Sequence, residues 1–149
     1  MKIINLRRFA GRARDEVAAA CARHCDVVSY NIYRVTIDDW RLPGGIDAPV
    51  MIGEFHFGAT DRGPFGTGVR QADDQVDRAE KMKGYVRSAL ANPLIVGVHW
   101  HQFSDQATSG RFDGEYLQVG WTDICDTPYP EAVFAVRELG EELYRTRNR

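Results

Sequence analysis

The stretch Pro49-Val-Met-Ile-Gly-Glu-Phe-His-Phe-Gly58 predicts how this chain folds. A short apolar run between a proline and a glycine-rich loop is typical of a buried strand. The run ends on a carboxylate and an imidazole, and a charge at the end of a buried strand is costly unless it is paired or functional. Alternation along the strand puts Glu54 and His56 on one face with Val50 and Ile52, so we expect both polar groups to line one cavity wall. Pairing of Glu54 with a neighbouring arginine is the alternative.

Strands and helices alternate on both sides of this stretch. Strands are expected over residues 3–6, 26–32 and 94–100 besides the quoted one, and helices over 12–24, 36–42, 73–91 and 130–144. A long loop with a small hairpin through 116–122 separates the last strand from the last helix. Continuous apolar strands alternating with helices predict an α/β fold with a parallel sheet, and the polar residues that follow the strands lie where such sheets place their sites.

Length and composition exclude several classes of function. The chain has 149 residues and fits one domain over 1–149, and its net charge of -2 comes from mixed acids and bases. Such a surface does not indicate a nucleic-acid or membrane partner. No signal peptide is recognisable at the start, so we expect a cytoplasmic protein, and no glycine fingerprint for a dinucleotide follows the first strand, so no cofactor is expected.

Four ordered motifs resemble a known group of enzymes. They are Asp26-Val-Val-Ser-Tyr-Asn-Ile-Tyr33, Gly53-Glu-Phe-His-Phe-Gly58, Val98-His-Trp-His-Gln102 and Gly110-Arg-Phe-Asp-Gly-Glu115. Together they resemble the C-terminal part of agarase-like and β-galactosidase-like retaining glycosidases, which have (β/α)8 barrels. The resemblance implies that Glu54 is the catalytic nucleophile at the seventh barrel strand. It also implies that Trp100 is a sugar platform on the eighth strand and that Tyr30 lies on the sixth, near the nucleophile.

The same resemblance implies a half-barrel of about four strand–helix units. A whole barrel takes about 250 residues, so the 149 residues of this chain agree with an incomplete barrel. Half a barrel leaves both sheet edges unpaired, so a homodimer that completes the barrel is expected, with two copies of Glu54 in one cavity. The family's acid, from an Asn-Glu motif on the fourth strand, is missing. The spacing of the two carboxyl groups would decide between a retaining and an inverting reaction.

The expected function is hydrolysis of β-linked sugars at Glu54, and the remaining candidates would bind the carbohydrate. These candidate binding residues are Tyr30, Asn31, His56, His99, Trp100, Gln102 and Glu115. Asp105, Asp113 and Glu115 are possible substitute acids, although turn formation and pairing with Arg111 also explain them. The alternative function is a catalytically incomplete carbohydrate-binding or barrel-assembly module. A third hypothesis, a metal-dependent hydrolase, would use His56, His99 and His101, whereas the main prediction includes no metal.

Overall fold

The computed structural model describes residues 3–6, 14–63 and 66–148. Its elements follow one another in this order: β1 (Ile3–Leu6), α1 (Asp15–His24), β2 (Val27–Asn31), β3 (Val50–Phe55), α2 (Gln75–Ala91), β4 (Ile95–Trp100) and α3 (Pro130–Arg147). The strands form one sheet in the order β1-β2-β3-β4, and every neighbouring pair is parallel. The prediction of an α/β fold with a parallel sheet is therefore confirmed.

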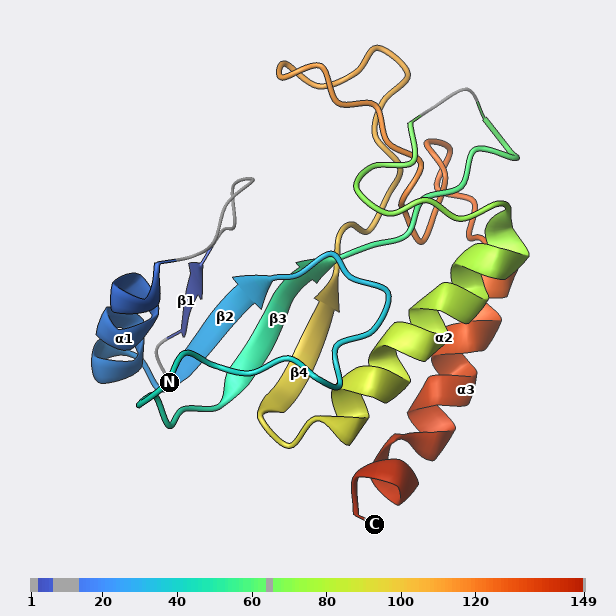
Figure 1. Cartoon of the computed structure of the whole chain (residues 1–149). Helices are drawn as coiled ribbons and strands as arrows, with labels where there is room; N and C mark the ends of the chain where they lie inside the picture. Colours follow the sequence, from blue (N-terminus) through green and yellow to red (C-terminus); the bar gives the residue numbers. More distant parts are fainter. Residues whose placement is uncertain (1–2, 7–13, 64–65, 149) are drawn as a thin grey trace.

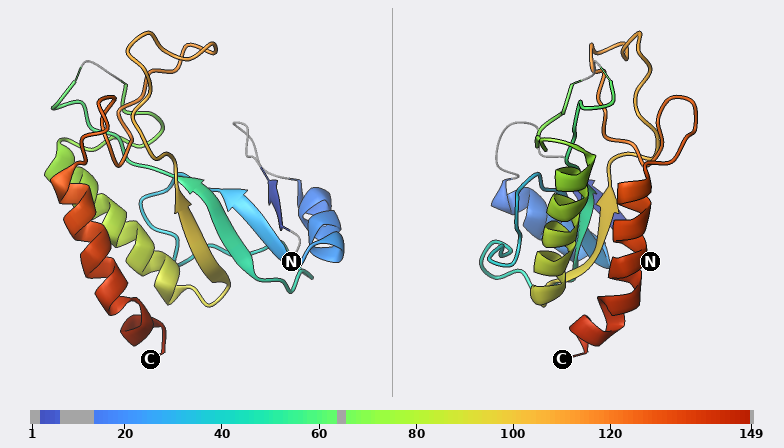
Figure 2. Two further views of the ribbon diagram at one scale, coloured as in Figure 1. Left: turned by 180° about the vertical axis from the view of Figure 1, so that it is seen from behind. Right: turned by 90° about the vertical axis from the view of Figure 1, so that its right-hand side faces the viewer.

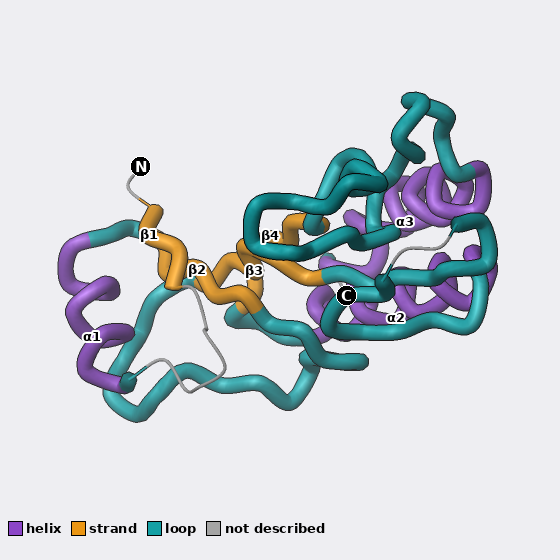
Figure 3. Tube along the Cα trace, turned by 90° about the horizontal axis from the view of Figure 1, so that it is seen from above, coloured by secondary structure: helices purple, strands orange, loops and turns teal. Residues whose placement is uncertain are grey.

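The helices gather at the two ends of the strand row. Figure 1 shows α1 beside β1, whereas α2 and α3 lie side by side next to β4 and run opposite to the strands. Seen from behind and along the strand ends, the strands form a row between α1 and the α2–α3 pair (Figures 2 and 3). The long loops after β3 and β4 lie together above the C-terminal ends of these strands. None of the helices in the described ranges is long and apolar enough to cross a membrane.

The helix expected over 36–42 does not form. An irregular segment joins β2 directly to β3, and side chains of the α2 region satisfy its backbone. Ser88 Oγ accepts from the Ile37 N–H at 2.9 Å, and Asn92 Nδ2 donates to the carbonyls of Ile37 and Trp40 at 3.0 and 2.9 Å. The segment also holds β-branched and aspartate residues of low helix propensity. Tertiary hydrogen bonds therefore replace the expected helical ones.

Two smaller expectations also differ from the structure. The hairpin through 116–122 is replaced by isolated bridges, in which Leu117 pairs with Gly66, and Thr122 with Ser104 and Pro128. The last helix continues to Arg147, and residues 12–13 of the first expected helix lie outside the described ranges. The loop after β4 is therefore held by isolated bridges, within itself and to Gly66, and not by a regular ladder.

The guanidinium of Arg78 on α2 is buried, with 1% of the residue exposed. It donates to the Phe57 carbonyl at 3.0 Å, to Gln75 Oε1 at 2.8 Å and to the Gly120 carbonyl. The rings of Trp100 and Tyr129 each lie 5.3 Å from it. Burial lowers the pKa of Arg78 to about 10, and the negative charge of Asp105 partly offsets this effect. One side chain thus joins α2 to the chain beyond β3 and to the loop after β4.

We predict that Arg78→Met lowers the free energy of unfolding by about 3–5 kcal/mol, because it leaves buried carbonyl groups without donors and Asp105 without its nearby cation. Urea unfolding followed by circular dichroism measures this change. Arg87→Met on the same helix is the matched control, since Arg87 is exposed and forms surface ion pairs with Glu138 and Glu142. It should cost less than about 1 kcal/mol. Equal losses in the two variants would contradict the anchoring role of Arg78.

Candidate active site

Glu54 lies next to the C-terminal end of β3, with its Cα paired to that of Asn31 on β2. The hydroxyl of Tyr33, two residues beyond β2, donates to Glu54 Oε2 at 3.0 Å. The carboxylate is half-buried. A phenol from one strand end therefore orients a carboxylate on the next. The bond between them is charge-assisted, because the acceptor is a carboxylate.

The alternation expected for β3 is broken before Glu54. The register with the neighbouring strands shifts between Ile52 and Phe55, as in a β-bulge. Phe55 continues the buried row of Val50 and Ile52, and its ring stacks on Tyr85 of α2 with centroids 4.2 Å apart. Glu54 therefore does not share the face of Val50 and Ile52, as strict alternation had predicted.

His56 packs against the same tyrosine that holds Glu54. Its ring centroid lies 4.7 Å from that of Tyr33 and 5.8 Å from that of His101. His56 is 2% exposed, and its Nε2 accepts from the Val69 N–H at 2.9 Å. Burial, together with the charges of His101 and Arg78 and against a hydrogen bond with the His101 backbone, lowers the pKa of His56 to about 3. His56 is therefore a neutral imidazole near pH 7, and it lies beside the site without being open to solvent.

The glycine-rich loop after β3 folds back onto His56 and Tyr33. Gly68 has a φ of +70°, and a Cβ there would lie 2.3 Å from His56 Nε2. Arg70 Nε donates to the Tyr33 carbonyl at 2.7 Å. A Cβ on Gly58 would lie 2.2 Å from the Thr67 carbonyl oxygen. Only glycine allows the two loop segments and the imidazole to approach this closely.

The structure places Tyr30, the tyrosine predicted to lie near the nucleophile, in a different environment. Tyr30 is 6% exposed and meets the ring of Trp40 edge-on at 4.9 Å. Tyr33, which ends the first of the four motifs, is the tyrosine that contacts Glu54, and the resemblance had implied no role for it. Asn31, the neighbour of Glu54 in the sheet, is also buried, and within the described part of the chain its Oδ1 has no hydrogen-bond partner.

Trp100, the expected sugar platform, is half-buried at the end of β4. Its ring meets those of Phe55 and Trp121, both at 5.2 Å, as well as the Arg78 guanidinium. Its Nε1 donates to the Val119 carbonyl at 2.7 Å. The indole therefore helps to fix the loop after β4, whatever surface it offers to a ligand.

The other predicted binding residues lie further along this loop or face solvent. His99 is exposed, and Gln102 Nε2 donates to the Ser104 carbonyl at 2.8 Å. Glu115 is exposed and accepts from Gln106 at 3.1 Å, with Arg111 3.3 Å away. The structure thus brings together Glu54, Tyr33, His56 and His101, and it engages Gln102 and Glu115 elsewhere.

The metal hypothesis based on His56, His99 and His101 is not supported. Within the described ranges no group of three or more histidine, cysteine or acidic residues is arranged to hold a metal ion. The Nε2 lone pair of His56, which a metal would need, already accepts the Val69 N–H.

The carboxylates considered as substitute acids serve the loop instead. Asp105 is buried and accepts from the Tyr129 hydroxyl and the Gly120 N–H, both at 2.6 Å. Asp113 pairs with Arg111 at 2.8 Å. Because Glu115 also contacts Arg111, these acids all have structural partners, as their turn-rich surroundings had suggested.

We predict that Gly68→Ala lowers the free energy of unfolding by about 2 kcal/mol, because alanine resists the left-handed conformation and its Cβ would displace His56. Gly84→Ala in α2 is the control, since a Cβ there meets nothing within 4 Å. That change should stabilise the helix by about 1 kcal/mol. Urea unfolding distinguishes the two variants, and an unchanged midpoint for Gly68→Ala would contradict the packing on His56.

A second prediction concerns pH. Because the pKa of His56 is about 3 when folded and about 6.5 when unfolded, the unfolded chain binds more protons between these values. Stability should therefore fall as the pH decreases through this window. From pH 6.5 to 4.5 the wild type should lose about 2 kcal/mol more than His56→Gln, measured by urea unfolding at each pH. Parallel losses in the two proteins would contradict the neutral, buried imidazole.

Comparisons with known proteins give one consistent result. No family model matches the chain. Beta-agarase B of Vibrio sp. (strain JT0107) is 43% identical over 136 residues, which cover 89% of this chain and 14% of the relative. Beta-agarase A of the same organism is 46% identical over 149 residues, covering 93% and 15%. The chain therefore spans about a seventh of the length of these curated relatives.

Solved structures agree with these relatives. An exo-beta-agarase superposes with a TM-score of 0.84 at 43% identity, covering 89% of this chain and 18% of that one. The agarase AgWH50C gives 0.86 at 39% identity, covering 92% and 22%. A GH2 beta-galacturonidase from Eisenbergiella tayi shares the fold alone, with a TM-score of 0.58 at 20% identity over 83% of this chain and 25% of that one. The homologues of this chain are beta-agarases of group GH50, as the sequence motifs had indicated.

Proposed function

We propose that this chain is the nucleophile-bearing half of a glycoside hydrolase barrel that acts on β-linked, galactoside-like sugars. The observation that carries the proposal is the 3.0 Å hydrogen bond from Tyr33 to Glu54 at the C-terminal ends of β2 and β3. Parallel barrels place their catalytic groups at this end of the strands. Homology to beta-agarases supports the same class of substrate.

Glu54 would act on the anomeric carbon of the sugar. In a retaining reaction the carboxylate attacks that carbon, and a covalent glycosyl-enzyme forms as the leaving oxygen takes a proton from an acid. Tyr33 holds Oε2 and so fixes the direction from which the carboxylate attacks. His56, neutral and buried, acts as a positioning residue for Tyr33 and not as the acid.

The acid must come from outside the described part of this half-barrel. Retention needs two carboxyl groups about 5 Å apart and inversion about 6.5–9.5 Å. Asp105, Asp113 and Glu115 are engaged in the loop after β4, so none of them serves as that acid in this proposal. In the proposed dimer the second copy contributes its own Glu54 across the cavity. The distance between the two Glu54 carboxyl groups then determines whether the reaction retains or inverts the anomeric configuration.

The open sheet supports the proposed dimer. β1 and β4 each have a single neighbouring strand in the described sheet, so both edges carry unpaired backbone groups. Val96 on the β4 edge is 56% exposed. Free edges with apolar residues favour association, and a second copy related by twofold symmetry can pair both of them.

The alternative is a carbohydrate-binding or barrel-assembly module without turnover. The engagement of all three substitute acids in the loop favours this alternative, because Glu54 alone has no proton donor for the leaving group. The two functions predict different effects of a neutral residue at position 54. A hydrolase would lose turnover, whereas a binding module would keep its affinity for the sugar.

We predict that Glu54→Gln lowers kcat for a chromogenic β-galactoside by at least about a thousandfold, because the amide cannot attack as a nucleophile. Tyr33→Phe should lower kcat by about tenfold while preserving the fold, since it removes one charge-assisted hydrogen bond. Glu80→Gln, an exposed residue of α2, is the control and should keep full activity.

Molecular mass from light scattering accompanies these assays. A dimer whose turnover depends on Glu54 supports the reconstituted hydrolase. Turnover that is absent, or unchanged by Glu54→Gln, contradicts it and favours the binding module, and a monomer contradicts the dimer.

A further inference from the structure

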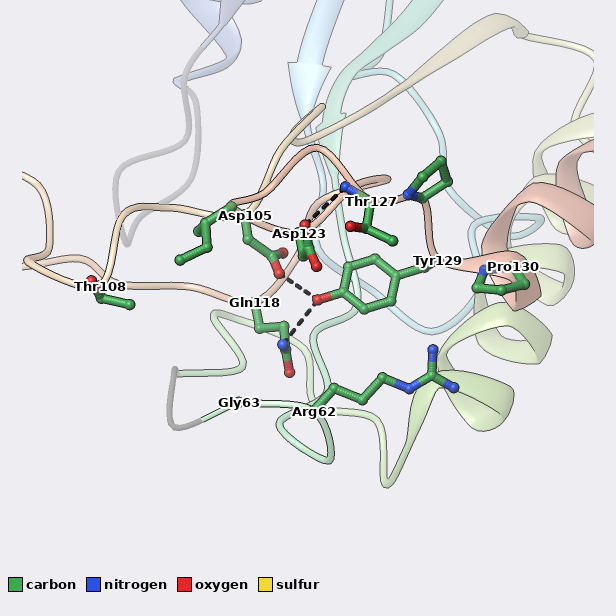
Figure 4. A pocket seen from close by; sticks show the side chains of 11 residues that line it. Arg62, Gly63, Asp105, Thr108, Gln118, Asp123, Thr127, Tyr129 and Pro130 are labelled. Atoms are coloured by element: carbon green, nitrogen blue, oxygen red, sulfur yellow. Dashed lines mark hydrogen bonds between the residues drawn. The ribbon is translucent and has the colours of Figure 1, made fainter.

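A cavity of about 550 Å³ lies between the loop after β3 and the loop after β4. Its lining includes Arg62, Asp105, Gln118, Asp123, Thr127 and Tyr129, and it includes none of the residues grouped around Glu54. Figure 4 shows the amide end of Gln118 between Tyr129 and the Arg62–Gly63 stretch. The volume is within the range of small-molecule sites.

The inner wall of this cavity is buried and hydrogen-bonded. Gln118 is 1% exposed and Tyr129 is 4% exposed. Gln118 Nε2 donates to the Tyr129 hydroxyl at 2.9 Å, and that hydroxyl donates to Asp105 Oδ2 at 2.6 Å. This chain of hydrogen bonds fixes which end of the Gln118 amide is nitrogen, and it directs the oxygen away from Tyr129.

Gln118 Oε1 is an acceptor that has no hydrogen-bond partner among the described residues. A buried carbonyl oxygen without a donor costs about 1–3 kcal/mol, so its retention calls for an explanation. Asp123 adds further acceptor capacity. Its Oδ1 receives the backbone N–H groups of Cys125 and Thr127 at 2.7 and 2.9 Å, which shapes the turn at the rim. Gln118 and Asp123 thus both bring acceptor oxygens to the cavity lining.

The charges around the cavity nearly cancel. Arg62 pairs with Glu131, and Asp105 offsets the buried charge of Arg78 behind the Tyr129 ring. Among the described lining residues, an anionic ligand would meet an Arg62 that is already paired with Glu131, and a cationic ligand would meet Asp105 and Asp123 carboxylates that already accept hydrogen bonds. Neutral hydroxyl groups suit the site, because each can donate to an oxygen of Gln118 or Asp123, while Ile124 and the flanking prolines supply apolar contact.

We propose that this cavity binds a neutral saccharide unit through its hydroxyl groups, separately from Glu54. The proposal stands whether or not Glu54 is catalytic. In a hydrolase the second site would hold another part of a long polysaccharide, and in a binding module it would be the principal site.

The test uses D-galactose as the probe and chemical-shift perturbation in ¹H–¹⁵N spectra of the full chain, which reports both affinity and location. Millimolar galactose should shift the amides of Gly63, Gln118 and Thr127. Thr108→Trp should weaken this binding at least tenfold, because the exposed Thr108 lines the cavity and an indole there would fill it. Ser109→Trp is the matched control, because Ser109 is also exposed but does not line the cavity. This variant should bind galactose as the wild type does.

Two further variants separate this site from the active site. Gln118→Met removes the unpartnered acceptor and should also weaken binding at least tenfold, whereas Glu54→Gln should leave the shifts at Gln118 and Thr127 unchanged. The proposal is overturned if galactose produces no shifts there, if Thr108→Trp binds as tightly as Ser109→Trp, or if Glu54→Gln abolishes these shifts. Binding of galactosamine without binding of galactose would also overturn it, in favour of a cation site.

Discussion

The burial of the Arg78 charge constrains the whole C-terminal end of the sheet. A guanidinium that is removed from water must regain its hydrogen bonds inside the protein, and here carbonyls from beyond β3 and from the loop after β4 supply them. Two segments of chain are therefore tied to one helix position. Because the rings of Trp100 and Tyr129 flank the same cation, the end of β4 and the start of α3 are held there as well.

This constraint determines how the candidate active site is built. Glu54 stands at the end of a buried strand, but its orientation depends on Tyr33, and Tyr33 depends in turn on the loop after β3. That loop is fixed at one end through Phe57 and Arg78, and further along by the contact of Gly68 and Val69 with His56. A catalytic carboxylate needs such support, since small displacements of reacting groups cost large factors in rate.

Sequence patterns predicted the elements whose burial is periodic and missed those fixed by tertiary contacts. The strands and the long helices follow from apolar runs and stripes. The segment 36–42 was expected to be helical, but Ser88 and Asn92, about fifty residues away, bind its backbone instead. Tyr30 was placed near Glu54 by the resemblance, whereas Tyr33, whose hydroxyl donates to Glu54, lies past the end of β2, where no periodicity indicates direction. The bulge before Glu54 is likewise invisible to a rule of period two.

The acidic residues of the loop after β4 have structural roles, and these roles limit the chemistry available to Glu54. Asp105 cannot act as a proton donor at Glu54 while it holds Tyr129 and Gly120, and Asp113 and Glu115 are occupied with Arg111. The loop after β4 therefore uses its acids to hold its own shape. In the proposed half-barrel, the open edges at β1 and β4 need a second set of strands, and Glu54 needs a second carboxyl group. A single partner that completes the barrel would meet both requirements, so the stability of the sheet and the competence of Glu54 would depend on the same contact.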